Sequence, residues 1–110
     1  MRERRISLRG QLQFPVVAMD GVQSINAQAT DLSSTGIQIV CDEKPSHAAG
    51  KLVRLEMTLP GADRPMTVEA RLVWRDGFRE GLAFAQLRDT DRLELAEAVD
   101  RLRGRHELSS

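Results

Sequence analysis

The chain has 110 residues and a mass of 12.3 kDa, which is the size of one domain. Hydrophobic residues make up 41% and charged residues 29%, so the composition predicts a folded globular domain and excludes the disordered class. No run of 18 apolar residues occurs, which excludes a membrane-spanning helix, and the net charge of +0 argues against a general nucleic-acid binder.

The first ten residues are rich in arginine and lack apolar periodicity. The charged residues in this stretch are Arg2, Glu3, Arg4, Arg5 and Arg9. Arginine suits phosphates and guanine edges, because its planar guanidinium forms bidentate hydrogen bonds and stacks. A high arginine content can equally follow from genomic base composition. We predict a flexible arm over residues 1–10, followed by one folded unit over residues 11–110.

Alternation of apolar and polar residues predicts three short strands in the first half of the folded unit. The first runs from about residue 11 to 18, and Asp20-Gly21 is a typical two-residue hairpin turn that joins it to a more polar second strand, over about 22–30. Pro15 favours an edge or bulge position in the first strand. A polar turn at 31–36 leads to the third strand.

Three more strands follow after a loop over residues 42–50. They cover about 53–59, 68–75 and 80–86, and Asp76-Gly77 marks the hairpin between the last two. The residues predicted to face inward in the six strands are Leu12, Phe14, Val16, Ala18, Ile37, Ile39, Cys41, Val53, Leu55, Met57, Leu59, Val68, Ala70, Leu72, Trp74, Leu82 and Phe84.

After Leu87 the apolar period changes to that of a helix. The residues at this spacing are Leu93, Leu95, Ala96, Val99 and Leu102. Acidic residues suit the first turn and Gly104 suits a stop, so we predict a helix over about 90–103. Six short strands followed by one helix predict a small antiparallel barrel, with the helix over an open seam or end.

The sequence contains no recognisable catalytic motif. His47 and His106 lack metal-ligand spacing and are predicted to be solvated surface residues. Cys41 is predicted to be a small core residue rather than a nucleophile. One cysteine cannot form an internal disulfide, and no secretory signal is predicted at the N-terminus, so we expect a reducing, cytoplasmic location. We expect no enzyme activity, no metal and no cofactor.

Two short motifs together are more specific than either alone. One is an R-x-x-x-R spacing in the arm, and the other is a D-x-S-x-x-G turn between two strands. Their residues are Arg5 and Arg9, preceded by Arg4, and then Asp31, Ser33 and Gly36. Taken singly, each has an ordinary explanation, as a solvated arm and as a structural Asx turn.

The order and spacing of the two motifs resemble the PilZ domain, a bacterial receptor module for cyclic di-GMP. The resemblance extends over nearly the whole chain, and Gly81-Leu82-Ala83-Phe84 is similar to the pattern of the family's closing strand. It implies an all-β fold with a C-terminal helix, a six-stranded antiparallel PilZ-like β-barrel. It also implies a non-enzymatic second-messenger receptor, here expected without an attached output enzyme and with an unknown downstream protein partner.

The resemblance implies ligand roles for the six motif residues. The three arginines would bind phosphates and the O6 and N7 atoms of guanine. Asp31 would accept hydrogen bonds from the Watson–Crick edge, and Ser33 would offer a hydroxyl to base or phosphate. Gly36 would allow a positive φ or a close backbone approach. Trp74, whose parity favours a core or rim position, and Gly81 are further candidates, Trp74 for stacking on the ligand.

The arm arginines also bear on how many ligands bind. One cyclic di-GMP brings two negative charges, which Arg5 and Arg9 balance. Arg4 adds a third cation, so we predict an intercalated pair of ligands per chain, the alternative being that Arg4 points into solvent.

Two other functions are consistent with parts of the sequence. A protein-interaction module of the same fold that does not bind nucleotide would typically lack the arginines or the turn motif, and this chain keeps both. An RNA- or DNA-binding barrel would use the arginine arm. It is disfavoured by the net charge of +0 and by an aromatic content of only one Trp and three Phe.

Overall fold

The computed structural model describes residues 6–8 and 13–108, with side chains omitted at 6 and 105–108. This part of the chain forms seven strands and one helix. Their bounds are β1 (Ile6–Ser7), β2 (Phe14–Met19), β3 (Ser24–Leu32), β4 (Gly36–Cys41), β5 (Leu52–Met57), β6 (Met66–Asp76), β7 (Arg79–Ala85) and α1 (Asp89–Leu108).

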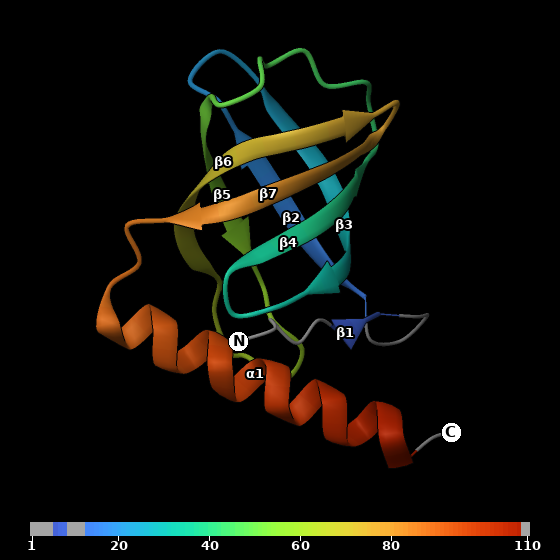
Figure 1. Cartoon of the computed structure of the whole chain (residues 1–110), viewed down its shortest axis with the longest axis vertical. Helices are drawn as coiled ribbons and strands as arrows, with labels where there is room; N and C mark the ends of the chain where they lie inside the picture. Colours follow the sequence, from blue (N-terminus) through green and yellow to red (C-terminus); the bar gives the residue numbers. More distant parts are fainter. Residues whose placement is uncertain (1–5, 9–12, 109–110) are drawn as a thin grey trace.

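Strands β2 to β7 form a closed antiparallel barrel (Figure 1). They pair in the order β3-β2-β5-β6-β7-β4, and pairing of β4 with β3 closes the barrel. Strand β1 adds to β3 beyond the end of β2. The predicted six-stranded antiparallel barrel with a C-terminal helix is therefore confirmed, and β1 is an addition that the sequence pattern did not indicate.

The barrel interior is filled by the apolar residues of inward parity. All the predicted ones that the structure describes are buried except Trp74, which faces outward, and Phe84, which is half-buried. The second strand also contributes Ile25, Ala27 and Ala29. Both predicted Asp-Gly hairpins are present, and Gly21 and Gly77 adopt φ values of 93° and 64°, the left-handed region that such turns require.

Helix α1 lies across one end of the barrel (Figure 1). Its buried apolar residues are Leu95, Ala98, Val99 and Leu102. The prediction that Leu93 and Ala96 share this face is wrong, since both are exposed. Residues 93 and 95 are two positions apart, about 200° around the helix, so they cannot face the same neighbour.

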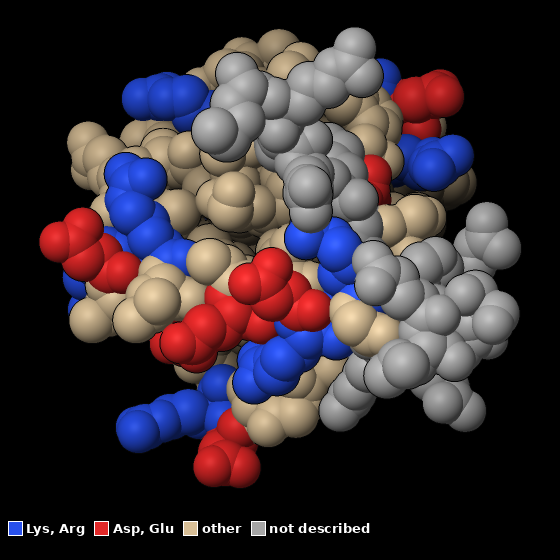
Figure 2. Space-filling view, turned by 60° about the horizontal axis from the view of Figure 1, so that its bottom comes forward, with Lys and Arg blue, Asp and Glu red and all other residues tan. Residues whose placement is uncertain are grey.

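The helix is longer than predicted. It continues through Gly104 to Leu108, because a glycine inside a helix costs only about 1 kcal/mol and does not by itself end it. Its outer surface is polar, and Figure 2 shows acidic and basic side chains interspersed on this lower face. In the described part of the chain, no helix is both long and apolar enough to cross a membrane.

Part of the predicted arm is attached to the barrel. Ile6 pairs with Leu32 and Ser7 with Asp31 in β3, and the amide of Leu8 donates to the carbonyl of Thr30 at 2.9 Å. The side chain of Leu8 is buried in the core. These contacts anchor residues 6–8 between the barrel and α1, which contacts β1. The mobility of the arm as a whole stays a prediction.

We expect Leu95→Ala and Leu93→Ala to affect folding very differently. Leu95 is fully buried between α1 and the barrel end, so truncation leaves a cavity and lowers the free energy of unfolding by about 2 to 5 kcal/mol. Leu93 is 62% exposed, and its truncation should change stability by less than about 0.5 kcal/mol. Urea unfolding of both variants measures this, and equal losses would contradict the observed orientation of α1.

Candidate ligand-binding site

Two β-bulges redirect side chains from the barrel interior to its outer surface. In β3 the register with β4 shifts between Ala29 and Asp31, so Thr30 is the extra residue. The hydroxyl of Thr30 donates to the carbonyl of Gln38 at 3.3 Å. Without the bulge, Asp31 would follow the inward parity of Ala29. With it, Leu32 is buried and Asp31 is turned outward, half-buried.

A second bulge has the same effect on Trp74. The register of β6 with β7 shifts between Leu72 and Trp74, and Val73 is the extra residue. Leu72 stays buried, whereas Trp74 is 39% exposed on the outer surface. The core or rim position that sequence parity predicted for Trp74 is therefore wrong, because strict alternation does not hold across a bulge.

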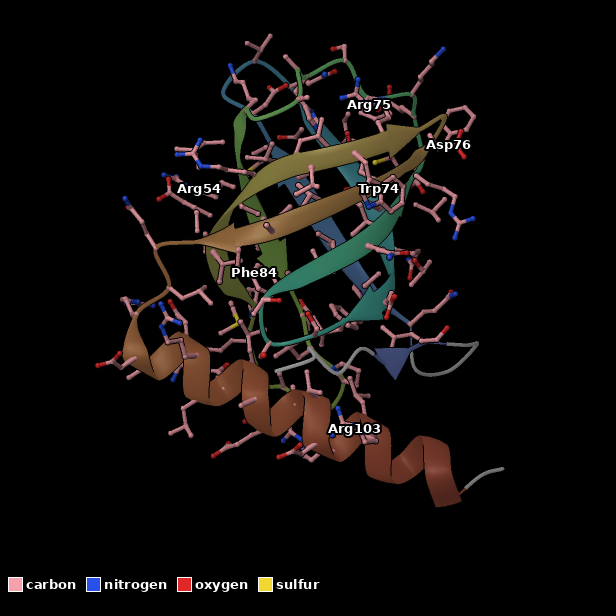
Figure 3. The ribbon with its side chains drawn as sticks, viewed as in Figure 1. Arg54, Trp74, Arg75, Asp76, Phe84 and Arg103 are labelled. Carbon is pink, nitrogen blue, oxygen red and sulfur yellow. The ribbon has the colours of Figure 1, made fainter. Side chains whose placement is uncertain are left out.

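The redirected residues lie in one row across four adjacent strands. Asp31 pairs with Gln38, Gln38 pairs with Gly81, and Gly81 pairs with Trp74. Ser7 of β1 extends the row on the other side of Asp31. Figure 3 shows Trp74 at the near face of the barrel, beside β7. The fold thus brings Asp31, Gly81 and Trp74 onto one surface, next to the anchored part of the arm.

The D-x-S-x-x-G turn at the edge of this surface is held by Ser33. Its buried hydroxyl accepts hydrogen bonds from the amides of Thr35 and Gly36, at 3.2 and 3.1 Å, and lies 3.3 Å from the carbonyl of Gly36. The amide of Ser33 also donates to the carbonyl of Gly36. Ser33 therefore shapes the turn, and its direct contact with a ligand stays a prediction.

The two candidate glycines are required by close packing. A Cβ atom on Gly36 would lie 2.6 Å from the carbonyl oxygen of Leu82, and Gly36 does not adopt a positive φ. Of the two roles proposed for Gly36, the close approach is therefore the one observed. A Cβ on Gly81 would overlap the indole of Trp74, which lies directly over this residue. Gly81 thus lets the indole lie close against β7.

A shallow hollow of about 310 Å³ lies between the turn and Trp74. Its lining residues are Thr35, Gly36, Val73, Trp74, Gly81, Leu82, Ala83 and Phe84. The hollow joins the D-x-S-x-x-G turn to the aromatic ring and to exposed Val73, so a flat heterocycle could contact both backbone and indole there. Three predicted ligand-binding residues, Gly36, Trp74 and Gly81, meet at this hollow.

The predicted phosphate-binding arginines lie outside the described residues. Arg4, Arg5 and Arg9 flank β1 in the sequence, and β1 pairs with Asp31 and Leu32. Their participation in the site stays a prediction.

A buried charged cluster supports the strand ends beside Trp74. Glu80 is fully buried, and its carboxylate contacts Arg75 at 3.1 Å and His47 Nε2 at 2.7 Å. Arg75 also donates to the carbonyl of His47. His47 Nδ1 lies 3.5 Å from Asp20. A buried carboxylate is tolerated only with such partners, so this cluster ties the loop over residues 42–50 to the barrel.

The cluster corrects one prediction and confirms another. His47 is 5% exposed rather than solvated, because the loop folds over the barrel end and inserts it between two carboxylates. The side chain of His106 lies outside the described residues. Cys41 is buried as predicted, and desolvation followed by the Glu80 charge raises the pKa of its thiol to about 11, so it stays protonated at neutral pH.

Asp20 holds the β2–β3 turn next to this cluster. Its carboxylate accepts from the amides of Val22 and Gln23 at 2.8 and 2.9 Å, and the amide of Gln23 followed by that of Val22 holds the pKa of Asp20 below its ordinary value. Over residues 6–8 and 13–108, no group of three or more His, Cys, Asp or Glu residues is arranged to hold a metal ion.

Comparison with known proteins identifies the family. The PilZ domain matches residues 3–101. The chain belongs to the PilZ domain family. The match includes both sequence motifs and all seven strands, and it ends within α1. A search of curated proteins gave no match.

Several solved structures share this PilZ fold. The PilZ domain of YcgR from Escherichia coli, solved with c-di-GMP, is 18% identical, has a TM-score of 0.81, and the match covers 99% of this chain and 95% of that one. The PilZ domain of CeSA from a cellulose-synthesizing bacterium is 18% identical with a TM-score of 0.72, covering 91% of this chain and 98% of that one.

A third similar structure is larger than this chain. MotI (DgrA), an inhibitor of motility from Bacillus subtilis, is 18% identical with a TM-score of 0.74, and the match covers 92% of this chain but 49% of MotI. The PilZ chain described here therefore spans about half the length of MotI. At 18% identity these similarities establish the fold.

Sequence reasoning missed several residues around this PilZ surface. Gln38 carried no motif signal, and its position beside Asp31 follows only from the strand register. Glu80 and Arg75 were assigned no role, although both take inward positions after the second bulge. Their positions follow from the strand register and carry no local sequence signal.

We expect Gly36→Ala to destabilise the barrel and Gly104→Ala to stabilise it. The added methyl group at position 36 meets the Leu82 carbonyl and forces β4 away from β7, at a cost of about 1 to 3 kcal/mol. At position 104 the methyl group meets open space in a helix, which gains about 0.5 to 1 kcal/mol. Denaturant unfolding measures both, and an unchanged stability of Gly36→Ala would refute the close-packing explanation.

Proposed function

We propose that this chain is a non-enzymatic cyclic di-GMP receptor that signals by ordering its N-terminal arm against the barrel. The observation that carries the proposal is the position of Asp31. It is turned outward by a bulge, lies beside β1 of the arm on one side, and belongs to the row that leads to Trp74 on the other. Family membership and the ligand in the YcgR PilZ structure support this choice of ligand.

The chemistry of the surface suits the two parts of this ligand. Asp31 is acceptor-only when ionised, so it complements the N1–H and N2–H₂ donors of guanine. The indole of Trp74, which packs on Gly81 and is partly exposed, would offer a stacking face for a base. The arm arginines supply the positive charge that the two phosphates need. Binding would then join arm, barrel and ligand into a new surface for a downstream protein in the cytoplasm.

Calorimetric titration with cyclic di-GMP tests the proposal. Arg9→Ala and Asp31→Ala should each weaken binding by roughly 5- to 150-fold, because each loses a contact worth roughly 1 to 3 kcal/mol. Arg54→Ala is the matched control, since Arg54 lies on β5 at the far edge of the barrel from Trp74 in Figure 3, and it should bind as the unaltered protein does.

The same titration gives the number of ligands per chain. We expect two, as an intercalated pair, and Arg4→Leu should reduce this number toward one while binding remains measurable. A folded protein that takes up no cyclic di-GMP would favour the alternative, a protein-interaction module that does not bind nucleotide. Normal binding by both Arg9→Ala and Asp31→Ala would place the ligand elsewhere.

We expect hydrogen exchange to report arm ordering. Without ligand, the two-residue strand β1 is held by few backbone hydrogen bonds, so amides of residues 2–10 should exchange quickly despite the buried Leu8. Saturating cyclic di-GMP should protect them, whereas amides of β5 should change little. Full protection of the arm in the free protein would disprove the ordering mechanism and leave binding itself untouched.

A further inference from the structure

Gln38 occupies the centre of the outer row and has no assigned role. It lies on β4 between Ile37 and Ile39, which are fully buried, so its side chain faces outward and is half-buried. Its cross-strand neighbours are Asp31 on β3 and Gly81 on β7. Gly81 presents no side chain of its own, and the indole of Trp74 lies over it on that side of Gln38.

The side-chain amide of Gln38 is available for a ligand. In the part of the chain that the structure describes, this side chain makes no hydrogen bond, and outside the strand ladders Gln38 is engaged by the Thr30 hydroxyl, at its backbone carbonyl. The Cβ atoms of directly opposite residues on one face of a sheet lie about 5 Å apart, so two such side chains can reach the same base edge. Asp31 and Gln38 therefore present a carboxylate and an amide side by side.

We propose that Gln38 is a further guanine-binding residue of the site, which donates a hydrogen bond to guanine O6 while Asp31 accepts from N1–H and N2–H₂. This inference rests on the proposed function. The Watson–Crick edge of guanine carries one acceptor and two donors, and a carboxylate can satisfy only the donors. An amide N–H beside it supplies the missing donor. Because O6 has two lone pairs, an arm arginine can still bind O6 and N7 from the other side.

Adenine separates the roles of the two side chains. The Watson–Crick edge of adenine carries an amine donor in place of O6 and an acceptor at N1. The N1 lone pair would face the Asp31 carboxylate, which has no proton to donate, whereas the Gln38 amide can turn its oxygen toward the amine. Asp31 therefore carries the discrimination against adenine, and Gln38 adds affinity through O6.

Gln38→Met is the sharpest test, because methionine keeps the length of the side chain and removes its donor. Affinity for cyclic di-GMP should fall about 2- to 12-fold, the loss of one hydrogen bond. Gln38→Glu should bind more weakly still, since its carboxylate would face O6 and Asp31. Gln28→Met, on an exposed outward position of β3, is the matched control and should bind normally.

A ligand with hypoxanthine bases separates the two contacts. Cyclic di-IMP keeps O6 and N1–H but lacks the N2 amine, so Gln38→Met should still weaken its binding, whereas Asp31→Ala should cost less than it does with cyclic di-GMP. Thermal unfolding checks that each variant is folded. Unchanged affinity for cyclic di-GMP in both Gln38 variants would overturn the inference while the proposed function stands. Failure of the unaltered protein to bind cyclic di-GMP would overturn both.

Discussion

The candidate site depends on two β-bulges, each of which adds one residue to a strand of the closed barrel. The hydrogen-bond ladders on both sides of Thr30 and of Val73 are regular. Each of these extra residues reverses the face of the sheet on which the following side chains of its strand lie. As a result Asp31 and Trp74 leave the interior and reach the same outer surface. A barrel of the same sequence length without bulges would bury a carboxylate and an indole in an apolar core, at a high cost for the charge.

The bulge at Val73 also explains the buried charges at the end of the barrel away from α1. Once Trp74 faces outward, the next pair, Arg75 and Glu80, faces inward. Their mutual contact and the insertion of His47 satisfy the buried carboxylate. The Trp74–Gly81 pair is therefore fixed between an apolar pair on one side and a charged pair on the other.

The arm and the helix meet at the opposite end of the barrel. Strand β1 pairs with β3 at Asp31 and contacts α1, and Leu8 belongs to the same buried core as the inner face of α1. Under the proposed function, ordering of the arm would act on α1, whose exposed surface carries charges of both signs (Figure 2). This geometry gives a short physical route from the outer row to a surface that a partner protein could contact.

The sequence by itself determined the number and approximate limits of the barrel strands, the inward residues of each regular strand, the terminal helix and the motif residues. Period-two alternation, Asp-Gly turns and helical spacing are local signals that act within a few residues. The bulges, the burial of His47 and Glu80, and the neighbourhood of Gln38 were decided only by tertiary structure. Each depends on which residues of distant strands lie opposite one another, and a one-residue shift of register, invisible in local alternation, reverses the face on which every later side chain lies.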